Sequence, residues 1–135
     1  MKIDFSQNLE HLAWACEELR VNFSPKDVTW LSAVDSEGKL TGVVIYSRHT
    51  TTNCEMSVVA ANPRFLTRRT LRTFFGYPFN QLGYLRVMAV TEHTNRRAAD
   101  FLQRLGFVLE GYLRKWFGTA DGLLMGMLKE ECPWL

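Results

Sequence analysis

Apolar and polar positions alternate along several short segments of the chain, or the segments are rich in β-branched and aromatic residues. Both patterns are typical of β-strands. We expect strands over residues 28–34, 40–48, 54–61, 84–92, 107–116 and 123–128. The turn-forming run Asp-Ser-Glu-Gly-Lys separates the first two, so they should form a hairpin. The 84–92 segment is apolar on both faces, which predicts a central strand that is covered on both sides.

Two segments instead repeat their apolar residues every three or four positions, as amphipathic helices do. The first runs from Ser6, a candidate N-cap, to Arg20. The second follows Thr67, another candidate cap, and keeps its apolar face through residue 82. Pro78 lacks an N–H group, so we expect a kink or break near residues 76–78.

A third helix is framed by end signals. Asn95 stands where an N-cap belongs, and Gly106 suits the left-handed position that follows a helix. The full order is therefore helix, three strands, helix, strand, helix and two strands. This mixture of antiparallel hairpins and strand–helix–strand crossovers predicts an α+β or mixed-sheet α/β fold. The N-terminal run Met-Lys-Ile-Asp-Phe offers only a short or absent strand before the first helix.

Composition limits the alternatives. With 135 residues and no linker or repeat, we expect one domain over residues 1–135. The net charge of +2 is too small to indicate a nucleic-acid binder by itself, so any anion site must be local. Cys16, Cys54 and Cys132 show neither disulfide nor metal spacing, so we expect free thiols and no metal. Without a signal sequence or an apolar span, we expect a cytoplasmic protein that is not embedded in a membrane.

The element order and the stretch "NRRAADFLQRLGFVLEG" together resemble the GNAT superfamily of N-acyltransferases. Its late motif is matched by Asn95, Ala98, Ala99, Leu105, Gly106, Phe107, Glu110 and Gly111. The tail "EGYLRKWF" looks most like the branch that acetylates ribosomal-protein N-termini, and the likeness covers about residues 28–131. The resemblance implies a GNAT-like mixed, mostly antiparallel sheet flanked by helices. It also implies acetyl transfer from acetyl-CoA to a primary amine, either a protein N-terminus or a small molecule.

In this family a glycine-containing loop before a helix holds the cofactor's pyrophosphate through backbone N–H groups. The matching segment "NPRFLTRRT" has no glycine, and either Asn62 or Arg64 can begin the motif. Cations at a helix start oppose its dipole, so the arginines here favour a bound anion over a merely solvated face. The resemblance assigns cofactor contacts to Val58, Val59, Ala60, Arg64, Phe65, Leu66, Thr67, Arg68, Arg69 and Asn95. Asn95 is equally well explained as a helix cap alone.

Acyl transfer needs a polarised thioester carbonyl and a base for the amine. The resemblance places a carbonyl-binding N–H around residues 58–60, and the candidate bases are Glu55, Glu92 and His93. Each of these three residues is also explained without a catalytic role, as a solvent-facing or loop residue. Leu102 stands where many members of the family carry an acidic tyrosine. We read Glu110 and Arg114 as a surface ion pair.

The sequence also fits two further functional classes. The missing glycines and tyrosine also fit a catalytically inactive GNAT-fold module that binds a protein or nucleic acid, or an acyl-CoA sensor or carrier. The expected partners of the enzyme are acetyl-CoA and an amine acceptor, with no membrane, and nucleic acid is not favoured. We also consider a homodimer in which the C-terminal Cys-Pro-Trp-Leu segment docks on the partner subunit.

Overall fold

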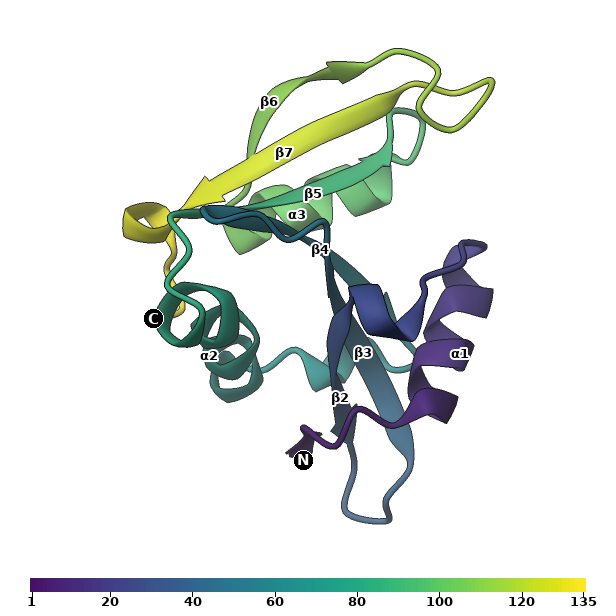
Figure 1. Ribbon diagram of the computed structural model, residues 1–135, viewed down its shortest axis with the longest axis vertical. Helices are drawn as coiled ribbons and strands as arrows, with labels where there is room; N and C mark the ends of the chain where they lie inside the picture. Colours follow the sequence, from purple (N-terminus) through teal and green to yellow (C-terminus); the bar gives the residue numbers. More distant parts are fainter.

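The computed structural model describes residues 1–135 as a seven-stranded sheet with helices on both faces (Figure 1). The strands are β1 (Lys2–Asp4), β2 (Thr29–Val34), β3 (Leu40–Ser47), β4 (Asn53–Ala60), β5 (Arg86–Glu92), β6 (Val108–Leu113) and β7 (Gly122–Leu128). The helices are α1 (Leu9–Leu19), α2 (Arg68–Gly76) and α3 (Arg96–Leu105). This order matches the one predicted from the sequence, with β1 added in front. No helix is long and apolar enough to cross a membrane.

The sheet order is β1-β2-β3-β4-β5-β7-β6. Every neighbouring pair is antiparallel except β4 and β5, which run parallel because α2 crosses between them. The predicted hairpin of β2 and β3 is confirmed, and β1 does exist, paired antiparallel with β2. The sheet is thus mixed and mostly antiparallel, as expected.

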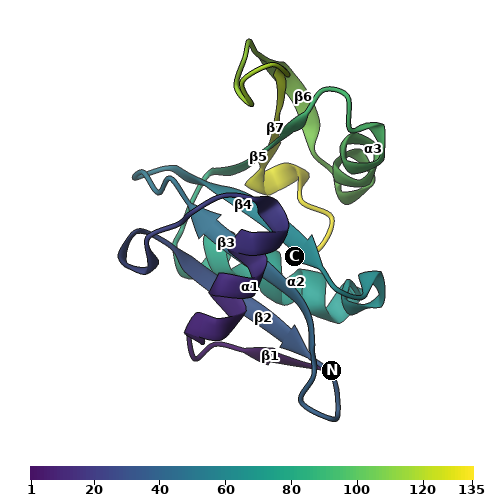
Figure 2. The same ribbon diagram turned by 90° about the vertical axis from the view of Figure 1, so that its right-hand side faces the viewer.

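Two hydrophobic clusters lie on opposite faces of the sheet, and β3 supplies both. Val43 and Ile45 point toward α1, while Val44 and Tyr46 join the larger cluster beneath α2 and α3. Successive side chains of a strand point to opposite faces, so a strand covered on both sides becomes continuously apolar. Figure 2 shows α1 across the front of β2 and β3, with α2 behind them.

The prediction that residues 84–92 are covered on both sides is wrong for β5. Val87 and Ala89 are buried on the α3 face, but Met88 and Val90 on the other face are only half-buried. The reason is that α1 covers the part of the sheet formed by β2, β3 and β4 and ends there. The face of β5, β7 and β6 that points away from α3 carries no helix (Figure 1). We call it the open face.

The helix start predicted at Ser6 is also wrong. The Asn8 side chain caps α1 by accepting from the N–H groups of Glu10 and His11. The chain first makes a turn in which Gln7 adopts a left-handed φ of 59°, and the Gln7 side chain bonds to the main chain of Trp30. A left-handed residue cannot continue a right-handed helix, so α1 starts only after this turn.

The other predicted helix ends are confirmed. The Thr67 side chain accepts from the Thr70 N–H, and the Asn95 side chain accepts from the Ala98 N–H at 3.0 Å. Gly106 ends α3 with a left-handed φ of 114°. α2 passes into a π-helical turn over Tyr77–Gln81, where the missing N–H of Pro78 breaks the α-helical pattern.

One predicted contact of the C-terminal half is replaced by another. A bulge in β6 between Leu109 and Gly111 shifts Glu110, which pairs with Arg86 at 2.6 Å instead of with Arg114. The terminal segment folds back on its own chain, and its docking on a partner subunit stays a prediction. There the indole N–H of Trp134 donates to the carbonyl of Leu105 at 2.8 Å.

Candidate cofactor and acceptor site

The parallel strands β4 and β5 pair over only part of their length. Their register covers Asn53–Glu55 against Arg86–Met88, although β4 continues to Ala60 and β5 to Glu92. Beyond Glu55 the strands diverge and form a V-shaped opening whose vertex lies at Glu55 and Met88. The edge of β4 that faces β5 beyond the vertex has no strand partner, so its backbone polar groups are available to a ligand.

A groove of about 810 Å³ runs along this opening on the face that carries α2 and α3. β4 contributes Val58 and Ala60, and the loop before α2 contributes Leu66. Asn95 and Phe101 of α3 line the opposite side. The middle of the groove is therefore apolar, and its volume is in the range of small-molecule and cofactor sites.

Positive charge gathers at the end of the groove beside α2. The N–H groups of Arg68 and Arg69 in the first turn of α2 have no hydrogen-bond partner, as is usual at a helix start. Across the groove, α3 brings Arg97 and Arg104 to the rim. Free N–H donors, the positive end of a helix dipole and several guanidinium groups together form an anion-binding end.

The C-terminal tail completes one wall of the groove. Trp134 lines it, held by the hydrogen bond to Leu105, and the Arg68 guanidinium carbon lies 5.8 Å from the centre of the Trp134 ring. Pro133 packs against Gly106, where an added Cβ would lie 3.2 Å from it. The sequence gives no signal for this wall, because a lone tryptophan after a proline has no periodicity to place it.

The predicted cofactor residues divide into groups. The side chains of Val58, Ala60, Leu66 and Asn95 line the groove. Three others do not line the groove themselves: Arg68 lies against the groove-lining Trp134, Thr67 caps α2, and Arg64 is an exposed residue of the loop before α2.

The remaining three predicted residues point elsewhere. Arg69 lines a different surface with Met1 and Lys2, so its side chain does not face the groove. Val59 packs under α1, because alternate strand residues face opposite sides. Phe65 is fully buried beneath the loop in the larger core cluster. At these positions only backbone atoms can reach a ligand in the groove.

Glu55 lies at the vertex of the V on the sheet face opposite the groove. Burial raises the pKa of the Glu55 carboxyl group, and the nearby positive charge of Arg48 only partly opposes this shift. Arg48 Nε lies 3.2 Å from Glu55 Oε1 without a directed hydrogen bond, and its guanidinium group lies 4.8 Å from the Trp116 ring. Glu55 thus lies beneath a cation that is itself stacked on an aromatic ring.

The other two candidate bases are not brought together with Glu55. Glu92 ends β5 and His93 follows it, roughly 13 Å of strand away from Met88 at the vertex. Both are exposed, and His93 Nδ1 lies 3.2 Å from the carbonyl oxygen of Asp121. Of the three candidates, Glu55 alone lies at the vertex.

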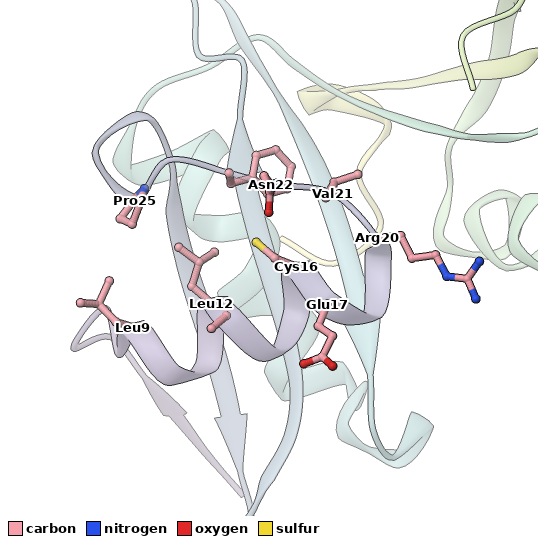
Figure 3. A pocket seen from close by; sticks show the side chains of 10 residues that line it. Leu9, Leu12, Cys16, Glu17, Arg20, Val21, Asn22 and Pro25 are labelled. Atoms are coloured by element: carbon pink, nitrogen blue, oxygen red, sulfur yellow. The ribbon is translucent and has the colours of Figure 1, made fainter. Parts of the chain in front are cut away.

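A second hollow of about 640 Å³ lies between α1 and the loop after it, and it shares no lining residue with the groove. Figure 3 shows Leu9, Leu12 and Cys16 spaced along α1, with Asn22 and Pro25 on the neighbouring loop. The predicted apolar stripe of this helix is only partly buried, and Leu9 remains 61% exposed.

Known structures share this architecture. A point mutant of the spermidine N-acetyltransferase SpeG from Vibrio cholerae has a TM-score of 0.70 at 18% identity, over 95% of this chain and 77% of that one. A dodecameric form of that enzyme gives 0.68 at 17% identity, over 96% and 82% of the chains. A GNAT-family acetyltransferase from Bacillus anthracis gives 0.62 at 19% identity, over 76% and 67%. The fold is that of the GNAT acetyltransferases. No family model and no curated protein matches the sequence.

The GNAT fold confirms the architecture that the sequence resemblance implies. These neighbours do not support the narrower likeness to the ribosomal-protein branch, since two of the three are forms of a spermidine enzyme. Leu102, which stands where many GNAT enzymes carry a tyrosine, is buried in the core beside Leu105. It offers no acid to a leaving thiolate.

Proposed function

We propose that this chain transfers an acetyl group from acetyl-CoA to a primary amine. The observation that carries the proposal is the continuity of the site. An anion-binding helix start leads into an apolar groove along β4, and Val58 of this groove lies three residues along β4 from Glu55, whose largely buried carboxyl group lies at the vertex on the other face. This arrangement suits a long ligand with a charged head and a reactive end.

The residues fit acetyl-CoA in a definite orientation. The pyrophosphate belongs at the N-terminus of α2, where free N–H groups and Arg68 meet it. The pantetheine arm belongs between Val58 of β4 and Asn95 of α3. This orientation directs the thioester toward the vertex. The unpaired edge of β4 then offers backbone N–H donors to the carbonyl oxygen, whose negative charge grows during the reaction.

Chemistry at the vertex needs one proton acceptor. The amine nitrogen forms a bond to the carbonyl carbon, the carbon–sulfur bond breaks, and its electron pair leaves with sulfur. Glu55 takes the amine proton, directly or through water, and its raised pKa makes it a better base than an exposed glutamate. A thiol with a pKa near 8.5 can leave as thiolate without a tyrosine acid. The acetylated amine and CoA are the products.

Calorimetric titration of acetyl-CoA into the protein tests the proposal, and α2 supplies a matched pair of variants. Arg68 lies at the groove and Arg69 faces away from it. We expect micromolar binding by the unmodified chain and roughly tenfold or greater weakening in Arg68→Ala, since hydrogen bonds to charged groups contribute about 1.5–3 kcal/mol. Arg69→Ala should change the affinity less than about threefold, since its charge is exposed and screened.

No binding at millimolar acetyl-CoA would overturn the proposal. Strongly salt-dependent binding of nucleic acid to the same arginines would then favour the catalytically inactive binding module. Equal losses in Arg68→Ala and Arg69→Ala would show that the cofactor does not lie in this groove. An acetyl-CoA titration that leaves both variants unaffected would place the anion elsewhere on the chain.

A further inference from the structure

The buried side-chain N and O atoms that lack a hydrogen-bond partner are Ser47 Oγ, Glu55 Oε1 and Arg86 Nε. All three belong to adjacent strands, β3, β4 and β5. Buried polar groups are almost always satisfied, so a cluster of unsatisfied ones calls for an explanation. These atoms lie beside the vertex of the V, where acetyl transfer would occur under the proposed function.

The strand register places the three residues on one face. Ser47 is directly opposite Glu55, and Glu55 is directly opposite Met88. Arg86 lies two residues before Met88 and therefore points to the same side of β5. Directly opposite residues have Cβ atoms about 4.5–5.5 Å apart and diagonal ones about 7–8 Å apart. The three side chains therefore lie in one row on the same face of the sheet.

Glu110 already binds Nη2, one of the two terminal nitrogens of Arg86. Its carboxylate lies against Gly126, where an added Cβ would clash with the Glu110 side chain, and it accepts from Arg86 Nη2 at 2.6 Å. Gly126 is the cross-strand partner of Met88, so this ion pair borders the same row of the sheet. The pair holds the guanidinium group through Nη2, while its buried Nε–H has no hydrogen-bond partner.

The chemistry of the three atoms defines what would satisfy them. Glu55 Oε1 accepts a hydrogen bond, and Ser47 Oγ can accept or donate one. Arg86 Nε only donates, so it needs an oxygen atom from the ligand. The reacting amine uses its single lone pair to attack the thioester, so an amine without another acceptor would leave Arg86 Nε unsatisfied.

Charge on this face also disfavours a polycation. The two carboxylates near the vertex are each matched by an arginine, Glu55 by Arg48 and Glu110 by Arg86. A second ammonium group close to the reacting amine would therefore meet no free carboxylate, and the next carboxylate on this face, Glu92, lies roughly 13 Å along β5 from Met88. Arg48 and Trp116 cover Glu55 from the solvent side and limit the room for a long chain.

We propose that the acceptor is an α-amino carbonyl compound, a peptide N-terminus or an amino-acid amide, whose amine meets Glu55 and Ser47 and whose carbonyl oxygen accepts from Arg86 Nε. This inference rests on the proposed acetyl transfer and specifies its acceptor. It separates this chain from the spermidine acetyltransferases that share its fold.

Two matched amines test the proposal. Alaninamide carries the carbonyl group, and sec-butylamine has a similar shape without it. In Arg86→Lys, which keeps the charge beside Glu110 but removes Nε, kcat/KM for alaninamide should fall about tenfold or more. The value for sec-butylamine should change less than about twofold. Comparing each amine with itself cancels the difference in basicity between them. The exposed Arg114, with no polar partner, gives the control: Arg114→Lys should leave both values unchanged.

A direct spectroscopic readout accompanies the kinetics. The Nε–H resonance of Arg86 in a 1H–15N spectrum, assigned by its loss in Arg86→Lys, should shift when alaninamide is added to the CoA-saturated protein. It should not shift with sec-butylamine or spermidine. The inference is overturned if Arg86→Lys lowers kcat/KM equally for alaninamide and sec-butylamine, or if spermidine has a higher kcat/KM than alaninamide. It is also overturned if adding alaninamide does not shift the Arg86 Nε–H resonance. Acetyl-CoA binding with such an outcome would leave the proposed function standing, whereas no acetyl-CoA binding would remove both.

Discussion

Gly42 on β3 supports the cofactor loop from below, and replacing it with alanine should disturb both stability and binding. A Cβ built on Gly42 would lie 2.6–2.7 Å from three atoms of the Phe65 ring. Phe65 is fully buried and packs edge-on against Phe74, with ring centres 5.8 Å apart. Non-bonded carbon atoms prefer about 3.5–4.0 Å, so the ring must move by roughly 1 Å. The loop between β4 and α2 would move with it.

Two opposing terms set the size of the effect. Overpacking a well-packed core costs about 1–3 kcal/mol. Alanine in place of glycine recovers roughly 0.5–1 kcal/mol of backbone entropy within a strand. The net loss for Gly42→Ala should be about 0.5–2 kcal/mol, a fall in melting temperature of roughly 2–8 °C for a chain of this length. Because Leu66 of the same loop lines the groove, acetyl-CoA affinity should fall as well.

Urea denaturation with calorimetric titration of acetyl-CoA measures both effects, and the chain supplies a control. Gly111 has no positive φ and no atom within 4 Å of an added Cβ, so Gly111→Ala should be neutral or slightly stabilising. Adding Phe65→Leu to Gly42→Ala removes the clashing ring, and the two changes should be non-additive. The packing argument is refuted if Gly42→Ala is as stable as the unmodified chain and binds acetyl-CoA equally well.

Trp134 and Glu55 lead to two further predictions. Trp134→Ala should weaken acetyl-CoA binding, because a wall of the groove is lost. In titrations Trp134→Phe should retain most of the affinity, and in urea it should lose about 1 kcal/mol with the hydrogen bond to Leu105. The raised pKa of Glu55 stabilises the folded chain fully below the unfolded pKa near 4.5, and this contribution is lost as the pH rises through the folded pKa. In urea titrations across that window the stability of the unmodified chain should therefore fall with rising pH relative to Glu55→Gln, and parallel profiles would contradict the burial of this carboxyl group.

Most of the fold could be predicted from local sequence patterns, because most of its helices and strands end at residues whose signals act locally. Thr67, Asn95 and Gly106 were predictable because a cap or a left-handed glycine acts within a few residues of its own position. Ser6 failed because the competing turn at Gln7 is held by the distant main chain of Trp30. A cap competes only with its neighbours, but a tertiary hydrogen bond can move the start of a helix.

The candidate site was predictable where the order of the elements places a residue, as for Asn95 in the groove and Glu55 at the vertex. The groove side of β4 and the start of α2 follow from the order of the elements. Arg86, Trp116 and Trp134 could not be predicted, because each one's contact joins positions at least 24 residues apart or depends on the β6 bulge. The Glu110–Arg86 pair shows the cause most clearly, since one extra residue in β6 changes which side chain Glu110 meets.

The loop without glycine bears directly on whether the groove can serve a phosphate. Glycine is needed where the backbone must adopt a positive φ or approach a ligand very closely. No residue from Asn62 to Thr67 has a positive φ, and the loop instead forms a 3-10 turn over Pro63–Phe65, capped by the Asn62 side chain. This backbone needs no glycine for its own conformation. Phe65 turns into the core, Arg64 is exposed and Leu66 lines the groove. The N–H groups of Arg68 and Arg69 at the start of α2 have no hydrogen-bond partner within the chain and can bind an anion.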